Sequence, residues 1–241
     1  FRSFGFLSEN SEFVRKCKEN GITFIGPDAD VIDKMGNKSH ARKTMMDAGV
    51  PVVPGTKEPV YDAETGKKLA EEIGYPVMIK ASSGGGGKGM RVAANEDEFE
   101  FQFNMAQRES ANAFGDDTMY IERFVENPRH VEIQIMADSH GNVVALGERD
   151  CSVQRNHQKL IEESPSPAID EKTRRKMNEY AVLAAKTVGY TNAGTIEFIV
   201  DPKGNFYFME MNTRIQVEHG VTEMVTGTDL IIEQIRVAMG E

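Results

Sequence analysis

Cysteine, long apolar runs and net positive charge are all scarce in this sequence of 241 residues. With only two cysteines, Cys17 and Cys151, the chain is no disulfide-rich scaffold, and we expect a reducing, cytoplasmic setting. No apolar stretch approaches the roughly 18 residues that a helix needs to cross a bilayer. Lys and Arg number 28 against 38 Asp and Glu, and the net charge of −10 would repel a phosphate backbone. We therefore expect neither a membrane nor a nucleic-acid partner.

What is present is typical of a globular protein, since 39% of the residues are hydrophobic and 27% are charged. Short strand-like runs alternate with helical stretches, which indicates an α/β or α+β fold. Residues 8–20 predict a helix, 22–25 a strand and 26–28 the start of another helix, an order that resembles the tail of a nucleotide-binding fold. After a helix over 38–48, the proline-rich stretch 51–56 predicts a hinge and a domain boundary.

Residues 52–124 predict a small unit of sheet and two helices. Asn95 and Glu98 have the spacing of a capping box, in which each side chain satisfies an unpaired amide at a helix start. From residue 129 onward the pattern predicts a larger sheet with two helices. The expected strands are 75–81, 90–94, 119–125, 129–137, 143–153, 191–200 and 205–211, and the expected helices of the larger part are 170–188 and 229–239.

The glycine loop from Ser82 to Arg91 is the most conspicuous local feature. Its glycines leave backbone amides free to surround phosphate oxygens, and Lys88 and Arg91 add positive charge. It is no Walker loop, because Lys88 is followed by Gly89 instead of Ser or Thr. It is no dinucleotide fingerprint, because a strand follows it instead of a helix. A phosphate-binding flap between two strands and an ordinary surface linker both remain open, and Lys80 at the end of the preceding strand would lie beside any phosphate.

Two glutamates interrupt the apolar strands of a predicted hairpin, Glu197 and Glu210. A two-residue turn at 203–204 would place them opposite each other, close enough to share a divalent cation. A three-residue turn would place them on opposite faces unless a second bulge compensates. Asn212 offers a third oxygen ligand, and ligation by oxygen alone suits magnesium or manganese.

Two polar stretches could complete such a site. Arg214, Gln216 and Glu218 fall at a spacing of two, so an extended segment would point an anion clamp, an amide and a base to the same side. The stretch 148–159 is unusually polar for the continuation of a strand and fits either a ligand groove or an exposed loop. Cys151 has no nucleophile context and predicts a small buried residue, while His130 is of a type more often structural than catalytic.

Taken together, these stretches resemble the ATP-grasp enzymes and, within them, the biotin carboxylases. The strand 75–82 with its glycine loop and the stretch 208–215 resemble signatures that are shared with carbamoyl-phosphate synthetases. The stretches 126–134, 148–159 and 214–219 resemble the biotin-dependent carboxylases specifically. The resemblance runs from about Gly5 to Glu241.

The resemblance implies an ATP-grasp fold with a small lid subdomain at 52–124 and an antiparallel-sheet subdomain at 125–241. These would form one ATP-grasp domain, 38–241, preceded by the end of a Rossmann-like N-terminal domain, 1–37. The lid would close the glycine flap and exclude water.

The resemblance also implies a function: ATP and bicarbonate form carboxyphosphate, and its carbon dioxide passes to biotin on a carrier protein or domain. By the resemblance, the nucleotide phosphates would be bound by Lys38, Lys80, Gly86, Gly87 and His157. The adenine and ribose would be bound by Glu122, Arg123, Phe124, Val125 and His130.

Glu197, Glu210 and Asn212 would hold magnesium or manganese. Lys159, Arg214 and the backbone of Val217 would bind bicarbonate, and Glu218 would act as the general base. The parent would be a homodimer working with a carboxyltransferase component, as in acetyl-CoA carboxylase of fatty acid synthesis.

Some positions depart from the resemblance. Family members usually begin this stretch with His-Pro-Gly-Tyr where Phe1-Arg2-Ser3-Phe4 stands, and they continue well past Glu241. Ser83 replaces a usual glycine, and Gly220 a usual proline. We therefore expect a piece truncated at both ends that encodes the ATP-site chemistry. A carbamoyl-phosphate-type ligase and a nucleotide-binding module without turnover remain the alternatives.

Overall fold

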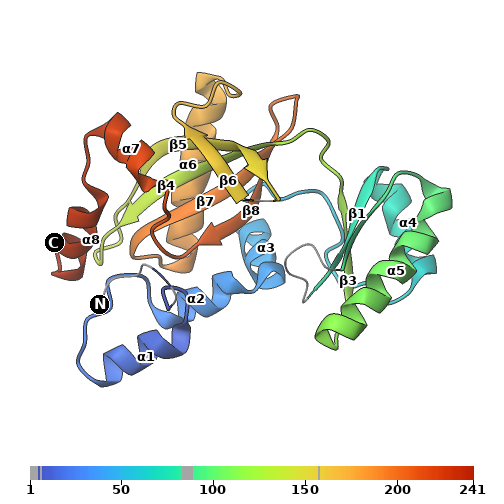
Figure 1. Cartoon of the computed structure of the whole chain (residues 1–241), viewed down its shortest axis with the longest axis horizontal. Coiled ribbons are helices and arrows are strands. Elements are labelled where there is room, and N and C mark those ends of the chain that lie inside the picture. Colours follow the sequence, from blue (N-terminus) through green and yellow to red (C-terminus); the bar gives the residue numbers. More distant parts are fainter. Residues whose placement is uncertain (1–4, 6, 83–88, 157) are drawn as a thin grey trace. The chain divides into compact units, whose positions relative to one another are not determined.

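The structure, a computed structural model of the chain, describes residues 5, 7–82, 89–156 and 158–241. The described residues between 53 and 126 form one compact unit, and those before 53 form a second unit together with those after 126. Figure 1 shows the helices and strands of each unit with their labels.

The smaller unit, 53–126, is built on a three-stranded antiparallel sheet with the order β2–β1–β3. Alternate side chains of the central strand, Val77 and Ile79, are fully buried and share an apolar core with Phe99 and Phe103. Asn95 accepts a hydrogen bond from the Glu98 amide at 3.1 Å, so the predicted helix start is confirmed. The elements are α4 (Ala63–Ile73), β1 (Val77–Ala81), β2 (Met90–Ala93), α5 (Glu96–Phe114) and β3 (Met119–Arg123).

The larger unit is built on a five-stranded antiparallel sheet with the order β6–β5–β4–β7–β8. Helix α6 (Glu171–Val188), which Asp170 caps at its first turn, packs against β4 and β5. The strands are β4 (Arg129–Ala137), β5 (Val143–Arg155), β6 (Gln158–Glu163), β7 (Asn192–Val200) and β8 (Phe206–Asn212).

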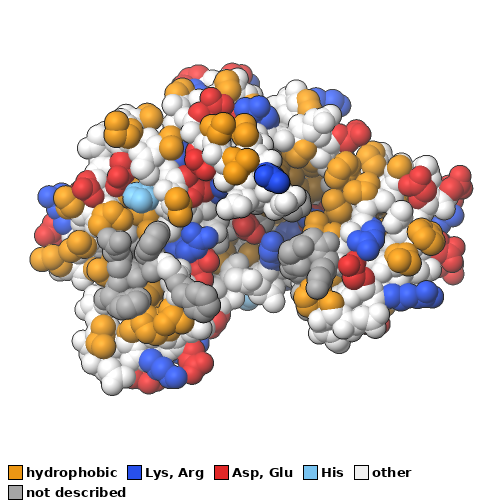
Figure 2. All heavy atoms as spheres, viewed as in Figure 1, with side chains coloured by type: hydrophobic (Ala, Val, Ile, Leu, Met, Phe, Trp, Pro, Cys, Tyr) orange, Lys and Arg blue, Asp and Glu red, His pale blue; other side chains and the backbone are white. Residues whose placement is uncertain are grey.

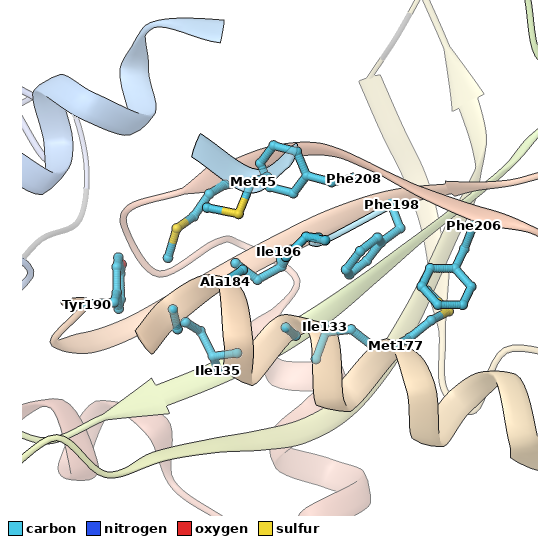
Figure 3. Close-up of a cluster of buried hydrophobic side chains, with 14 of the residues drawn as sticks. Met45, Ile133, Ile135, Met177, Ala184, Tyr190, Ile196, Phe198, Phe206 and Phe208 are labelled. Atoms are coloured by element: carbon cyan, nitrogen blue, oxygen red, sulfur yellow. The ribbon is translucent and has the colours of Figure 1, made fainter. Parts of the chain in front are cut away.

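One face of this sheet is apolar. Ile133, Ile196 and Phe198 point to the same side as their strands alternate, and each is fully buried. Figure 3 shows them against Met177 and Ala184 of α6. Burial of each large apolar side chain contributes about 1.5–3 kcal/mol, so this face anchors the sheet.

The other face of the same strands is polar. His130, Glu132 and Gln134 alternate with the apolar residues of β4, and Glu132 and Gln134 are completely buried nonetheless. Helix α7 (His219–Thr226) packs against β5. Buried polar groups of this kind require hydrogen-bonding partners, so the residues of this face must satisfy one another.

The remaining helices are α1 (Ser11–Glu19), α2 (Ala29–Gly36), α3 (Lys38–Asp47) and α8 (Leu230–Ala238). The strand expected over 22–25 is wrong, since only Ile25 takes part in a bridge. A strand depends on hydrogen bonds to a neighbouring strand, and neither described sheet includes this segment.

Acidic and basic side chains are interspersed over the face of the molecule shown in Figure 2. Among the described residues, none of the helices combines the length and the apolar character that a membrane crossing requires.

Candidate active site

The register of the β7–β8 hairpin decides which residues share the polar face. Next to the turn, Val200 pairs with Phe206, which is the register of a three-residue turn. Further along, the register shifts by one residue at Met209, and Glu197 then pairs directly with Glu210. Of the registers that the sequence left open, the structure therefore has the longer turn together with a compensating bulge.

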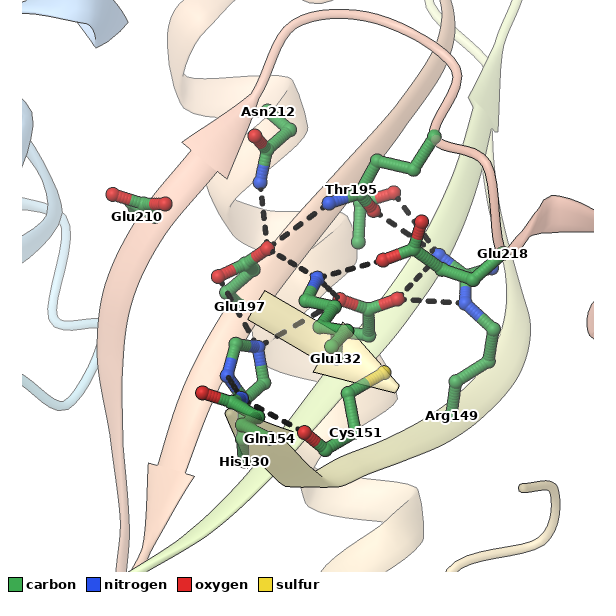
Figure 4. A network of polar contacts seen from close by, with 12 residues as sticks. His130, Glu132, Arg149, Cys151, Gln154, Thr195, Glu197, Glu210, Asn212 and Glu218 are labelled. Carbon is green, nitrogen blue, oxygen red and sulfur yellow. Dashed lines mark hydrogen bonds and ion pairs between the residues drawn. The ribbon is translucent and has the colours of Figure 1, made fainter. Parts of the chain in front are cut away.

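The same register brings the three expected metal ligands to one face. Asn212 pairs with Thr195, two residues from the Glu197–Glu210 pair on each strand, so these side chains emerge on the same side. The Asn212 amide donates to Glu197 Oε1 at 2.8 Å. Glu197, Glu210 and Asn212 are thus adjacent on the sheet, as Figure 4 shows.

Lys38, expected at the nucleotide phosphates, lies beside this group. It begins α3, and its Nζ lies 3.1 Å from Glu210 Oε2. Lys38, Glu210 and Asn212 line a cavity of about 210 Å³ in which Glu9 and Thr213 also take part. One end of the polar face therefore offers a hollow lined by a cation and four oxygen-bearing side chains.

Lys159 occupies the centre of the polar face. Its Nζ lies 2.5 Å from Glu132 Oε2, 2.8 Å from Glu197 Oε1 and 2.8 Å from Glu218 Oε1. It stands on β6, a strand that the sequence analysis did not predict. Figure 4 shows the three carboxylates pointing toward one another, and one ammonium group holds them together.

Charge, more than burial, sets the protonation of this cluster. Burial disfavours the charged form of Lys159, but the Glu132 and Glu197 carboxylates outweigh it and raise its pKa. Burial likewise raises the pKa of Glu132 and Glu197, but contacts with His130 and Lys159 outweigh it, so both pKa values are lowered. The two carboxylates therefore stay ionised, which cation binding requires.

His130 faces the same cluster, with Nε2 3.1 Å from Glu197 Oε2. Burial lowers its pKa, but Glu132 and Glu197 outweigh this and raise the pKa to about 9. The Gln154 amide nitrogen, which donates to the Cys151 carbonyl at 2.8 Å, lies 3.0 Å from His130 Nδ1. If Nδ1 also carried a proton, it would face the N–H groups of the Gln154 amide, and that amide would have to rotate by half a turn. The contact with Gln154 therefore disfavours the doubly protonated imidazole.

Cys151 is completely buried, as the sequence predicted. Its sulfur lies within 4.8 Å of carboxylate oxygens of Glu132 and Glu218. Burial, reinforced by the Glu132 charge, raises the pKa of this thiol, so it stays protonated and unreactive.

The extended segment expected for 214–218 is wrong, because the chain bends and turns there before α7 begins. Ile215 is 1% exposed in a separate apolar cluster, and burying it turns the chain. Gln216 and Glu218 still reach the polar network, and Gln216 Nε2 donates to Glu197 Oε1 at 3.0 Å. Arg214 turns away to Glu9, with Nε 3.1 Å from Glu9 Oε2. The side chain of Val217 is exposed.

Arg149, like its partner Glu132, belongs to this network although the sequence did not single it out. It is completely buried, and its Nε donates to Glu132 Oε1 at 2.7 Å while Nη1 donates to Gln134 at 2.7 Å. Further bonds reach Thr222 of α7 at 2.8 Å and Gln216 at 3.2 Å. Its position opposite Glu132 in the β4–β5 ladder is the signal that could have revealed it.

The candidate residues of the smaller unit form their own cluster. Lys80 of β1 forms an ion pair with Glu122 of β3, which pairs with Met78 in the sheet. Arg123 ends β3, and the backbone amides of Arg123 and Phe124 donate to carbonyls of the unit at 2.8 and 2.9 Å. Val125 lies beyond the strand, which is shorter than expected. Gly86, Gly87 and His157 lie outside the described residues.

Two protein families match the chain. The family described as carbamoyl-phosphate synthase L chain, ATP binding domain, matches residues 37–241, and the biotin carboxylase N-terminal domain matches residues 1–32. Biotin carboxylase 1 from the chloroplast of Populus trichocarpa is 59% identical over 238 residues, which are 99% of this chain and 45% of that protein. Biotin carboxylase 2 of Bacillus subtilis is 57% identical over 237 residues, 98% of this chain and 53% of that protein. The chain spans about half the length of these curated relatives.

Solved structures agree with this match. A biotin carboxylase–beta-gamma-ATP complex from Campylobacter jejuni is 55% identical, with a TM-score of 0.89 over 99% of this chain and 53% of that one. The biotin carboxylase domain of 2-oxoglutarate carboxylase from Hydrogenobacter thermophilus, in complex with MgADP, ADP and bicarbonate, is 52% identical. Its TM-score is 0.87 over 99% of this chain and 52% of that one. The predicted mixture of helices and antiparallel sheet is confirmed. The chain belongs to the ATP-grasp family described as carbamoyl-phosphate synthase L chain, ATP binding domain, and the relatives that it matches over 98–99% of its length are biotin carboxylases.

Proposed function

We propose that the chain carries the site at which ATP and bicarbonate react in an ATP-dependent biotin carboxylation. The observation that carries the proposal is the position of Lys159, whose ammonium joins an expected metal ligand, Glu197, to the expected base, Glu218. A single polar face thus holds groups suited to a metal–nucleotide complex next to groups suited to a small anion.

Magnesium fits the residues at one end of this face. Glu197 and Glu210 are direct neighbours, and the Asn212 side-chain oxygen has only a 3.5 Å contact with Arg214, so it is free to turn to a cation. These three residues would hold magnesium or manganese, which when bound neutralises phosphate charge during phosphoryl transfer. Lys38 in the larger unit and Lys80 in the smaller one would bind phosphate oxygens, with Gly86, Gly87 and His157 assigned by resemblance alone.

Bicarbonate would bind next to the proposed metal ligands, since Arg214 Nη2 lies 3.5 Å from Asn212 Oδ1 and Lys159 Nζ lies 2.8 Å from Glu197 Oε1. Lys159 and Arg214 supply positive charge, and the Val217 backbone adds a donor. In the proposed reaction Glu218 accepts the bicarbonate proton, a bicarbonate oxygen attacks the γ-phosphorus, and ADP leaves, which yields carboxyphosphate. Glu132 and Arg149 hold Lys159 and Gln216 in place during this step. Glu122, Arg123, Phe124, Val125 and His130 would bind the adenine and ribose.

Biotin on a carrier protein or domain would accept the carbon dioxide released from carboxyphosphate. Relatives include a propionyl-CoA carboxylase alpha chain from Ruegeria pomeroyi besides the plant and bacterial biotin carboxylases. On the sequence resemblance alone, the same proposal includes acetyl-CoA carboxylation in fatty acid synthesis, a carboxyltransferase partner, a homodimeric parent and a cytoplasmic setting. Domain limits of 1–37, 38–241 and, for the lid, 52–124 complete it, with 125–241 as the sheet subdomain.

ATP hydrolysis measured with and without bicarbonate, and with and without free biotin, tests this function. We expect bicarbonate to stimulate phosphate release. A rate of ATP hydrolysis that does not change with bicarbonate would favour a different ATP-grasp ligase. Nucleotide binding without hydrolysis would favour a nucleotide-binding module without turnover.

A further inference from the structure

Glu9 connects the start of the chain to the loop that follows β8. It lies in a turn before α1, where the Ser8 amide donates to the Gly5 carbonyl at 3.1 Å. On its other side, Asn10 caps α1 by accepting from the Phe13 amide at 2.8 Å. The backbone on both sides of Glu9 is therefore fixed by local hydrogen bonds.

Both oxygens of the Glu9 carboxylate are engaged by residues 204 and 205 positions away in sequence. Oε1 accepts from the Thr213 amide at 3.0 Å and from its hydroxyl at 3.3 Å. Oε2 accepts from Arg214 Nε at 3.1 Å. Thr213 is 2% exposed, so the carboxylate rests on a buried support and cannot swing with the arginine.

This arrangement fixes the plane of the Arg214 guanidinium. Glu9 engages Nε, while Nη1 and Nη2 have only long contacts, 3.4 Å to the Ile215 carbonyl and 3.5 Å to Asn212 Oδ1. A guanidinium binds planar anions best through two parallel N–H bonds from one edge. With Nε taken, the edge formed by the two terminal nitrogens is the one left for an anion.

We propose that Glu9 is a positioning residue that orients Arg214 so that its terminal nitrogens bind bicarbonate. This inference rests on the proposed function. It assigns a role in the anion site to residues 1–32, the part of the chain that matches the biotin carboxylase N-terminal domain, whereas Arg214 lies in the part that matches the ATP-binding domain.

Two effects of removing Glu9 oppose each other, and their sizes decide the outcome. Loss of the negative charge strengthens the attraction of Arg214 for an anion, but side chains that are 31% and 42% exposed are screened by water. Loss of orientation affects both anion hydrogen bonds at once, and misplacement of a binding group is costly. The loss of orientation should outweigh the loss of the negative charge, so we expect the KM for bicarbonate to rise.

The test compares Glu9→Ala and Glu9→Gln with the wild-type chain in bicarbonate-dependent ATP hydrolysis. We expect Glu9→Ala to raise the KM for bicarbonate about tenfold while the KM for ATP changes less than about twofold. Glu9→Gln should give a smaller increase, since its amide oxygen can still accept from Thr213 or Arg214. Glu12→Gln is the matched control, because this exposed residue of α1 pairs with Lys16 and should leave both KM values unchanged.

A double variant separates orientation from a general structural role. In an Arg214→Lys background the ammonium has no plane to orient, so adding Glu9→Ala should change the KM for bicarbonate little further. An equal increase in both backgrounds would overturn the inference, as would an unchanged or lowered KM in Glu9→Ala alone. Absence of bicarbonate stimulation in the wild-type chain would instead overturn the proposed function, and the inference with it.

Discussion

Lys159 Nζ and Glu218 Oε1 lie 2.8 Å apart, and this pair joins the edge strand β6 to the start of α7. Glu218 stands at the N-terminal end of α7, where its side chain caps no helix amide. Among the described residues, Lys159 makes the ion pair that holds the Glu218 carboxylate. Binding of an anion to Lys159 would break this ion pair and leave the carboxylate able to accept a proton.

Glu218→Gln should abolish bicarbonate-dependent turnover while nucleotide affinity stays nearly unchanged. The amide keeps the shape of the side chain but cannot accept a proton, and loss of a general base typically lowers kcat about 10²- to 10⁴-fold. Steady-state phosphate release and ADP titration would measure the two quantities. Weakened nucleotide binding would mean that Glu218 has a different role.

Glu197→Gln should weaken Mn²⁺ binding in the presence of ADP. Removing one carboxylate charge from a pair of neighbouring ligands should cost at least about 10- to 100-fold in metal affinity. Electron paramagnetic resonance of free Mn²⁺ would measure it. Glu179→Gln, on the exposed side of α6, is the control that should bind Mn²⁺ as the wild type does. Equal affinity in both variants would remove Glu197 from the ligand set.

Arg149→Met should destabilise the larger unit strongly. The substitution removes the buried cation at 2.7 Å from Glu132 Oε1 and leaves that oxygen completely buried without it, and breaking a buried pair on one side costs about 3–5 kcal/mol of the free energy of unfolding. Urea unfolding would measure it. Arg175→Met, at an exposed position of α6, should change the free energy of unfolding by less than about 0.5 kcal/mol. Similar losses in both variants would contradict the central role of Arg149.

Asp150 should make stability depend on pH in the acid range. Burial raises its pKa, but hydrogen bonds from Ser152, Ser166 and Arg129 outweigh it, and the pKa lies below the usual 3.8. A lowered folded-state pKa contributes stability above 3.8 that is lost as the pH falls through the folded value. Asp150→Asn should therefore flatten the acid limb of a plot of unfolding free energy against pH. An unaltered slope would show that another carboxylate dominates there.

Local patterns predicted the elements of this fold better than their connections. The alternation along 129–137 gave β4, and the spacing of Asn95 and Glu98 gave the start of α5, because each depends only on neighbouring residues. The strand over 22–25 failed because strands need partners, which no local pattern reveals.

In the candidate site, too, the features that depend on contacts between distant segments could not be predicted from local patterns. The Glu197–Glu210 pair depended on a turn length and a bulge at Met209, two shifts that cancel, and the sequence alone could not choose between them. Ile215 bent the segment that was expected to be extended, since burying it outweighed the polar alternation. Arg149 went unnoticed because its importance comes from five partners on other segments.

The proposed reaction is tested most directly by measuring whether an oxygen atom passes from bicarbonate to the released phosphate. Bicarbonate labelled with ¹⁸O is mixed with ATP and the chain in unlabelled water, and the released phosphate is analysed by mass spectrometry before the label exchanges with water. Attack by bicarbonate on the γ-phosphorus leaves one bicarbonate oxygen in the phosphate, so we expect one ¹⁸O for each bicarbonate-dependent turnover. Phosphate without label would mean that water attacks instead, and would contradict the proposed reaction at this site.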